Sequence, residues 1–288
     1  MSRQSRSATV GSYTLPSHLD GDGRRLNQQH EVFQLRFSSN LITTKSLPAD
    51  FSGTVLDIGT GTGIWAAEFA AKYPASSVLG IDLFAPSITP VPANCRFQVL
   101  NVEDIDDDGK ILAHGTFDII HTRMVFCVLR HGRKVLQMCF HALKPGGVVE
   151  FQEKQDPYRS DDPSAEAQDT PLLRHGRLRT KAAMNCGLDR AVANKVPGWM
   201  REMGFSDVQV KEWKIPIGEW MDGRDMKIAG QKFRECLEWG TLGICKSVFM
   251  EGLGWSEQQV LHNVTDTVED LGNGRVYMLV LVISGTKV

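Results

Sequence analysis

The sequence predicts an α/β protein built on a doubly wound, mostly parallel sheet with helical cap insertions. Three observations predict this fold class. Short apolar stretches alternate with helical patterns between residues 54 and 152, a glycine-rich loop follows the first of these stretches, and a very apolar strand lies near the C-terminus at 276–284. Strands that are separated by helices need right-handed crossovers, which produce a parallel sheet covered on both faces.

The individual elements follow from the spacing of apolar residues and from the residues that end each run. Strands are expected at 54–58, 77–82, 96–100, 117–121, 148–152, 208–210 and 276–284. Helices are expected at 24–37, 64–73, 134–143, over most of 172–204, at 225–244 and at 256–271. Residues 154–170 are polar and contain Pro157 and Pro163, so regular structure is expected to break there.

This order of elements predicts one domain with a cap. Residues 1–23 are polar and rich in Ser, Gly and Arg, so this segment is expected to be partly disordered. Residues 24–288 then form a single domain, in which 24–50 and 154–204 make a helical cap and 222–272 make an insertion. The strand at 276–284 completes the sheet late in the chain.

The composition is that of an ordinary soluble globular protein of 288 residues, with 42% hydrophobic residues and a formal net charge of −2. No run of Lys and Arg stands out, so neither nucleic acid nor a membrane is expected as a partner. No stretch is apolar enough for a signal peptide or a membrane span, which favours the cytoplasm, with the nucleus as a second location. The six cysteines are scattered singly without a Cys-x-x-Cys pair, so no metal site is expected.

The sharpest local signal is the segment Asp57-Ile-Gly-Thr-Gly-Thr-Gly63, between an expected strand and an expected helix. Glycines let the backbone turn tightly and let a ligand lie directly against it. The helix that follows presents unpaired N–H groups and a partial positive charge, which suit a carboxylate. The Gly-x-Gly-x-Gly spacing differs from the Gly-x-Gly-x-x-Gly of dinucleotide-binding dehydrogenases. A ligand site of another kind is therefore indicated, with a purely structural turn as the alternative.

Candidate ligand-binding residues also follow the second and the third expected strand. Asp82 ends the second strand, where a carboxylate can accept hydrogen bonds from both hydroxyls of a ribose; a helix N-cap or a turn is the alternative. Asn101-Val-Glu103 follows the third strand. Asn101 and the backbone of Val102 are expected to read the edge of an adenine, with Leu83 and Val102 against its face.

Together these segments resemble the class I S-adenosylmethionine-dependent methyltransferases, and more narrowly the fungal LaeA-like methyltransferases. The likeness extends over nearly the whole chain and is carried by Tyr13-Thr-Leu-Pro16, Arg25-Leu-Asn-Gln-Gln-His30, Val55-Leu-Asp-Ile-Gly-Thr-Gly-Thr-Gly-Ile-Trp65, Phe117-Asp-Ile-Ile-His-Thr-Arg123, Leu143-Lys-Pro-Gly-Gly147 and Pro216-Ile-Gly218. The resemblance implies a Rossmann-like sheet of seven strands, S-adenosylmethionine as cofactor and S-adenosylhomocysteine as product. It also implies either a secondary-metabolite substrate or a regulatory role.

The resemblance also implies which residues bind the cofactor. Carried over by position, Asp57, Gly59 and Gly61 would contact the methionine part, Asp82 the ribose, and Asn101 to Glu103 the adenine end. The expected set is completed by Tyr13, Thr60, Leu83 and His121, with Tyr13 in an N-terminal segment that closes over the cofactor. The family often has Asp at the position of Asn101 and small polar residues where Phe84-Ala85 stands, so a bulkier adenine wall is expected here.

Methyl transfer to a held nucleophile needs distance and orientation, and it needs a base only where the acceptor is a neutral alcohol or a protonated amine. His121, at a strand end, is the candidate base; packing against the cofactor or holding a loop is an equal alternative. Glu153, at the end of the fifth strand, is expected either to orient a substrate or to be a solvated strand end. Arg123 is expected to pair with a substrate carboxylate or with Glu153, or to be exposed.

Three functions stay open at this point. The first is methyl transfer from S-adenosylmethionine to an O, N or S atom of a small molecule, a fungal secondary metabolite. The second is a LaeA-like regulator of secondary metabolism that acts through protein partners, and the third is a non-methylating enzyme on the same fold. The glycine loop and Asp82 favour cofactor binding under all three, so they do not separate them.

Overall fold

The computed structural model describes residues 8–10, 13–15, 22–104 and 112–288, and of 8–10 and 13–15 the backbone alone. The chain divides into two compact units. The helical unit comprises Met1–Ser39, Lys154–Arg190 and Trp213–Val280, and the glycine-loop unit comprises Asn40–Glu153, Ala191–Glu212 and Leu281–Val288. The predicted cap and insertion ranges therefore overlap the helical unit without matching it.

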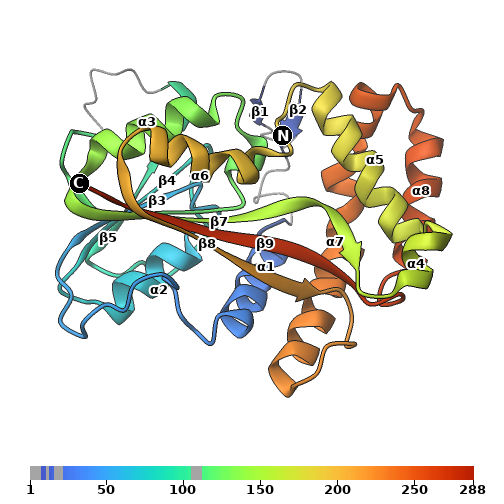
Figure 1. Cartoon of the computed structure of the whole chain (residues 1–288), viewed down its shortest axis with the longest axis horizontal. Coiled ribbons are helices and arrows are strands. Elements are labelled where there is room, and N and C mark those ends of the chain that lie inside the picture. Colours follow the sequence, from blue (N-terminus) through green and yellow to red (C-terminus); the bar gives the residue numbers. More distant parts are fainter. Residues whose placement is uncertain (1–7, 11–12, 16–21, 105–111) are drawn as a thin grey trace, which may run out of the picture. The chain divides into compact units, whose positions relative to one another are not determined.

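A seven-stranded sheet in the order β5-β4-β3-β6-β7-β9-β8 is the framework of the fold (Figure 1). Its strands are β3 (Thr54–Ile58), β4 (Ser77–Asp82), β5 (Cys95–Val99), β6 (Phe117–Arg123), β7 (Leu143–Ser160), β8 (Phe205–Pro216) and β9 (Val276–Lys287). The pairs β3–β4, β4–β5, β3–β6 and β6–β7 are parallel. The strand order reverses between β3 and β6, and open α/β sheets bind ligands beside the carboxyl ends of the strands at such a point. The predicted fold class is confirmed.

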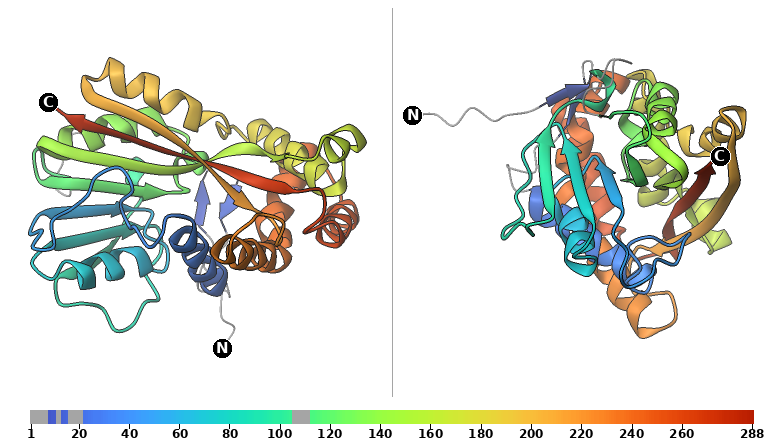
Figure 2. Two further views of the ribbon diagram at one scale, coloured as in Figure 1. Left: turned by 60° about the horizontal axis from the view of Figure 1, so that its bottom comes forward. Right: turned by 90° about the vertical axis from the view of Figure 1, so that its left-hand side faces the viewer.

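Helices cover both faces of the sheet in the glycine-loop unit. These helices are α2 (Ile64–Lys72), α3 (Gly132–Ala142) and α6 (Val192–Glu202), with the 3-10 turns η2 (Val102–Asp104) and η3 (Phe126–Val128). α2 lies on one face, and α3 and α6 lie on the other (Figure 2). α2 buries Trp65 and Phe69 in an apolar cluster with Val55, Val78 and Ile119. This burial fixes the start of α2 at the carboxyl end of β3.

The helical unit is built mainly from helices that pack on one another. Its helices are α1 (Asp22–Arg36), α4 (Pro163–Gln168), α5 (Pro171–Asn185), α7 (Arg224–Leu253) and α8 (Glu257–Glu269), and β1 (Ala8–Val10) pairs with β2 (Tyr13–Leu15). Ala182 of α5, Phe249 of α7 and Val260 of α8 share one apolar cluster. The start of α8 is fixed by a capping box between Ser256 and Gln259.

Most of the predicted elements are confirmed, and one prediction is wrong. Strands 54–58 and 77–82 have the predicted bounds, and the other predicted strands and helices are present with shifted ends. Residues 154–170 were expected to lack regular structure, but β7 continues to Ser160 and α4 follows. α4 begins because the side chain of Asp162 accepts a hydrogen bond from the N–H of Ser164.

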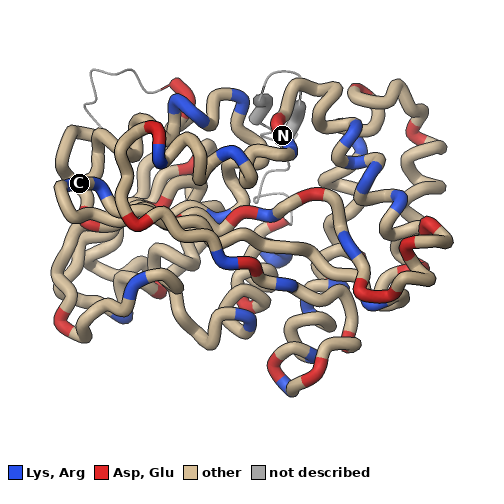
Figure 3. Tube along the Cα trace, in the orientation of Figure 1, with Lys and Arg blue, Asp and Glu red and all other residues tan. Residues whose placement is uncertain are grey.

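Charged residues of both signs are interspersed along the described chain (Figure 3). No helix among the described residues is both long and apolar enough to cross a membrane.

Candidate active site

The glycine loop joins the carboxyl end of β3 to the start of α2. Gly59, Gly61 and Gly63 have φ angles of 70°, 58° and 87°, in the left-handed region that favours glycine. The N–H groups of Gly59 and Thr60 donate to the carbonyl oxygen of Ile81 over 2.9 and 3.0 Å, which ties the loop to β4. Gly63 is the N-cap of α2 and offers no side chain to the first N–H groups of the helix. These groups therefore suit an anionic ligand.

Asp57 holds the loop from the end of β3. Its carboxylate is buried; Oδ2 accepts a hydrogen bond from the hydroxyl of Thr60 over 2.6 Å, and Oδ1 lies 2.8 Å from Nδ1 of His121. Both carboxylate oxygens are thus engaged by protein groups. The contact of Asp57 with the methionine part of a cofactor stays a prediction.

Asp82 reaches from the end of β4 to the glycine loop. Its Oδ2 accepts a hydrogen bond from the N–H of Gly61 over 2.8 Å, and its Oδ1 accepts one from the N–H of Phe84 over 3.1 Å. The residue is half-buried, so its carboxylate can still meet a ligand. Of the predicted apolar wall, Leu83 is half-buried and Val102 is buried.

The side chains of Asn101 and Glu103 hold the protein's own backbone. Oδ1 of Asn101 accepts from the N–H of Glu103 over 3.1 Å, and Nδ2 donates to Asp104 over 3.0 Å. Oε1 of Glu103 accepts from the N–H groups of Arg130 and His131 over 2.8 and 2.7 Å, just before α3. These contacts shape the loop after β5, and direct contact with an adenine stays a prediction for both residues.

His121 lies inside the glycine-loop unit. The strand registers place Asp57, His121 and Glu150 side by side on β3, β6 and β7. The imidazole is 1% exposed and stacks on Trp65, with ring centroids 3.7 Å apart and planes 5° apart. Among the described residues, Nε2 has no hydrogen-bond partner. This geometry suits a residue that holds the loop; that role and the role of a base both stay predictions.

Glu150 is a buried carboxylate that sequence reasoning missed. It accepts hydrogen bonds from the N–H groups of Thr43 and Thr44, each over 2.9 Å, and from the hydroxyl of Thr44 over 2.6 Å. It also accepts from the amide of Gln152 over 2.7 Å. Glu150 thereby ties the segment before β3 to the middle of the sheet. The alternation of Glu150 and Gln152 within an apolar strand was the signal that could have found it.

Glu153 and Arg123 have definite partners. Oε1 of Glu153 accepts from the N–H groups of Val125 and Phe126 over 2.8 and 2.9 Å, and the side chain is fully buried. The prediction of a solvated strand end is therefore wrong, because this carboxylate closes the turn after β6. Nε of Arg123 donates to Oε1 of Gln152 over 2.7 Å, on the neighbouring strand.

The side chain of Tyr13 lies outside the described residues, so its predicted contact with the cofactor stays a prediction. In the part of the chain that the structure describes, no three His, Cys, Asp or Glu side chains are grouped so as to hold a metal ion.

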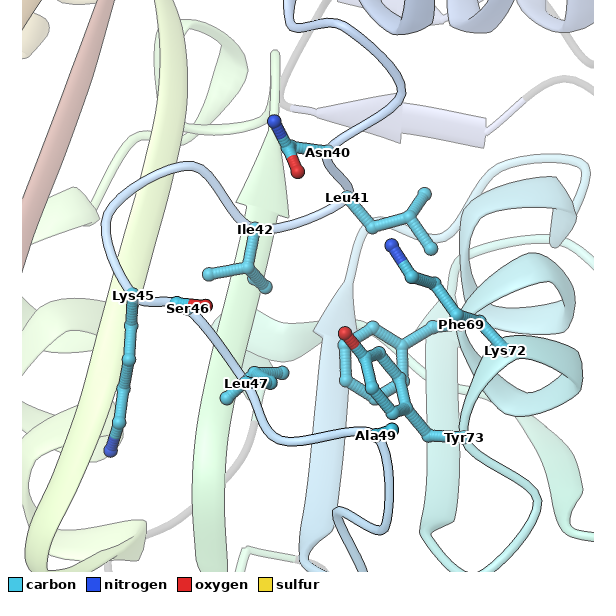
Figure 4. Close-up of a pocket in the computed structure, with 10 residues that line it drawn as sticks. All are labelled: Asn40, Leu41, Ile42, Lys45, Ser46, Leu47, Ala49, Phe69, Lys72 and Tyr73. Atoms are coloured by element: carbon cyan, nitrogen blue, oxygen red, sulfur yellow. The ribbon is translucent and has the colours of Figure 1, made fainter.

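A pocket of about 450 Å³ lies between the segment that precedes β3 and the second half of α2 (Figure 4). It is lined by Asn40, Leu41, Ile42, Lys45, Ser46, Leu47, Ala49, Phe69, Lys72 and Tyr73. None of the predicted site residues lines it. One of its walls, the segment from residue 40, is the segment that Glu150 holds through Thr43 and Thr44.

Comparisons with known proteins agree with this geometry. A family model described as a methyltransferase domain matches residues 29–210. The methyltransferase pytC of Aspergillus terreus is 30% identical over 255 residues, which cover 87% of this chain and 75% of pytC. The secondary metabolism regulator laeA of Aspergillus fumigatus is 26% identical over 281 residues, which cover 93% of this chain and 70% of laeA.

A solved structure shares the fold. The phosphoethanolamine N-methyltransferase 2 of Haemonchus contortus, in complex with phosphomonomethylethanolamine and S-adenosylhomocysteine, superposes with a TM-score of 0.50 at 16% identity. The match covers 91% of this chain and 52% of that one, so this chain spans about half the length of that enzyme.

Proposed function

This chain belongs to the class I S-adenosylmethionine-dependent methyltransferases, in their LaeA-like group, and we propose that it methylates a small molecule of the secondary-metabolite type. In this proposal an O, N or S atom of the small molecule receives the methyl group. The similarity to pytC, which is named a methyltransferase, supports it.

The observation that carries the proposal is a glycine loop held between two carboxylates. Asp57 engages Thr60, and Asp82 engages the N–H of Gly61. A Cβ at Gly59 would lie 2.3 Å from Cγ2 of Val125, so a side chain there does not fit without a shift of Val125. The residues present fit S-adenosylmethionine: the first N–H groups of α2 suit its methionine carboxylate, and Asp82 suits its ribose hydroxyls.

The chain's own contribution to the reaction is positioning. When bound, the cofactor supplies an electrophilic methyl group on a sulfonium. Correct distance and orientation of the acceptor can lower the barrier by about 7–11 kcal/mol in favourable cases. Nδ1 of His121 is engaged with Asp57 and its ring is covered by Trp65, which supports a positioning role for His121.

The second candidate function is regulation through protein partners. It is favoured by the similarity to laeA, which is named a secondary metabolism regulator and which this chain matches over 93% of its own length. Under this alternative the same loop binds the cofactor, and the partners are proteins. A non-methylating reaction on the same fold is the third candidate, and it would leave the cofactor unconsumed.

The test is a labelling experiment on the purified full chain. The chain is incubated with S-adenosylmethionine labelled in its methyl group and with a protein-free extract of fungal metabolites. Label in a small molecule, with an equal amount of S-adenosylhomocysteine, is expected for wild type and absent for Asp82→Ala. Cofactor binding without any labelled small molecule, together with stable capture of partner proteins, would favour the regulator. A new product without S-adenosylhomocysteine would favour the third candidate.

A further inference from the structure

The pocket between residues 40–49 and α2 (the α2 pocket) combines an apolar floor with a basic rim. The floor is made of side chains that are at most 8% exposed: Leu41, Ile42, Phe69 and Tyr73. Lys45 and Lys72 are exposed on the rim, and none of the described residues that line the pocket is Asp or Glu. A volume of about 450 Å³ is within the range of small-molecule sites in proteins. The pocket therefore offers both apolar area and positive charge to a ligand.

Tyr73 presents its hydroxyl to the α2 pocket. The residue is 8% exposed, and its ring packs on that of Phe69 with ring centroids 4.8 Å apart. Among the described residues, none forms a hydrogen bond with the hydroxyl, which points towards the middle of the pocket (Figure 4). A ligand that enters the pocket covers this hydroxyl, so such a ligand has to supply a hydrogen-bond acceptor.

Lys72 brings a positive charge close to Tyr73. Its Nζ lies 5.7 Å from the centre of the Tyr73 ring. Within the described part of the chain, neither Lys72 nor Lys45 forms an ion pair. The side chain of Lys45 extends away from Lys72 (Figure 4), so Lys72 is the cation that a ligand in the pocket meets first. A hydroxyl donor and an ammonium donor on one wall suit a carboxylate, which accepts through two oxygens.

We propose that the α2 pocket binds a small aromatic carboxylate. One carboxylate oxygen accepts the O–H of Tyr73 and the other accepts from Nζ of Lys72, and such charge-assisted hydrogen bonds are stronger than neutral ones. The aromatic body of the ligand covers the apolar floor, where the rings of Phe69 and Tyr73 provide ring-to-ring contacts. The pocket shares no residue with the glycine loop at 57–63, so this binding is separate from the proposed methyl transfer.

Calorimetric titration of the full chain with cinnamate, and with cinnamamide as its neutral counterpart, tests the proposal. Wild type is expected to bind cinnamate about tenfold more tightly than cinnamamide. Tyr73→Phe keeps the ring and removes the hydroxyl, so it should bind cinnamate about tenfold more weakly than wild type. Lys72→Gln should bind it about fivefold more weakly. Lys134→Gln removes an exposed lysine of α3 in the same unit and should bind like wild type.

Three results of this titration would overturn the proposal. They are no binding of cinnamate, equal binding of the two probes, and unchanged binding of cinnamate by Tyr73→Phe. A loss in Lys134→Gln as large as that in Lys72→Gln would also contradict it, because the effect would then be one of overall charge.

Acetylation of lysines, read by mass spectrometry, locates the probe independently. Saturating cinnamate is expected to slow acetylation of Lys72 and to leave that of Lys134 unchanged, and equal acetylation of Lys72 with and without cinnamate would contradict the site. Gly61→Val, which strains the glycine loop at a φ of 58°, should bind cinnamate like wild type. Loss of cinnamate binding in this variant would place the probe at the glycine loop and overturn the proposal. Loss of cofactor binding alone would bear only on the proposed function.

Discussion

The imidazole of His121 lies flat on the indole of Trp65, with ring centroids 3.7 Å apart. Each ring also makes a polar contact. Nδ1 of His121 lies 2.8 Å from the carboxylate of Asp57, and Nε1 of Trp65 donates to the carbonyl oxygen of Leu41 over 3.1 Å. The pair therefore connects the residue that holds the glycine loop to the segment that precedes β3. A substitution of either residue is therefore expected to disturb the glycine loop.

Trp65 is expected to contribute mostly through burial. Trp65→Ala should lower the free energy of unfolding by about 3–5 kcal/mol, because the side chain is almost fully buried and its loss leaves a cavity. Trp65→Phe keeps a ring against His121 and loses the hydrogen bond to Leu41, so a loss of about 1–2 kcal/mol is expected. Urea unfolding measures both. Equal losses in the two variants would mean that the stacked ring contributes nothing of its own.

Variants of His121 separate a positioning residue from a base. His121→Ala should weaken S-adenosylmethionine binding about tenfold, because Asp57 loses a hydrogen bond to a charged group. His121→Asn places an amide nitrogen where Nδ1 was, so it should bind the cofactor more tightly than His121→Ala. Calorimetry measures both constants.

The pH profile of turnover completes this test. A positioning role predicts that the pH dependence of kcat is the same in His121→Asn as in wild type. A fall in kcat of about 10²–10⁴-fold, with normal cofactor binding and loss of one limb of the profile, would instead identify His121 as the base.

Glu150→Gln is expected to loosen the segment that precedes β3. The substitution keeps the shape of the side chain and removes the charge that accepts the N–H groups of Thr43 and Thr44. A loss of about 1–3 kcal/mol in unfolding free energy is expected, with faster hydrogen exchange at both amides. Glu202→Gln, an exposed carboxylate that pairs with Arg133, should change stability by less than about 1 kcal/mol. Unchanged exchange at Thr43 and Thr44 would rule out this role.

Because of His175, the free energy of unfolding is expected to decrease as the pH is lowered. Its pKa is about 4 in the folded state and 6.5 in the reference state, with burial as the first cause. The unfolded chain therefore binds more protons between these values, so stability is full above pH 6.5 and declines as the pH falls towards 4. The total decline attributable to His175 is on the order of 3 kcal/mol.

Urea unfolding at a series of pH values measures this slope. His175→Gln should flatten it between pH 6.5 and 4. His262→Gln is the control, because His262 is exposed on α8 and should leave the slope unchanged. The depressed pKa of Asp156, which Lys154, Arg190 and Arg179 hold down against the effect of burial, acts in a lower window, as the pH falls below about 4. A slope that His175→Gln leaves intact would contradict the assignment.

The first half of the sheet could be predicted because its strands are apolar runs bounded by Gly and Pro. The strand 54–58 and the strand 77–82 have the predicted bounds for this reason. The continuation of β7 to Ser160 could not be predicted in this way, because Lys154 and Asp156 are charged. The charge of Asp156 is compensated by Lys154 and by two arginines, Arg179 and Arg190. The arginines lie more than twenty residues further along the chain, so local periodicity does not reveal this pairing.

The candidate site, like the sheet, could be predicted only in part. Asp57, Gly61 and Asp82 meet at the loop as their positions after successive strands predicted, because parallel strands end at one edge of the sheet. The partner of His121 could not be predicted from spacing alone. The stacking of Trp65 on His121 depends on how α2 packs on the sheet, which the sequence pattern does not specify.

The most direct test of the account is calorimetric titration with S-adenosylmethionine and S-adenosylhomocysteine. Wild type is expected to bind both with micromolar affinity, and Asp82→Ala and Gly61→Val should lose this binding, the latter because valine is strained at a φ of 58°. Asp50→Ala, an exposed residue, is the control. Folded wild type that binds neither ligand, or Asp82→Ala that binds like wild type, would contradict the cofactor site described above.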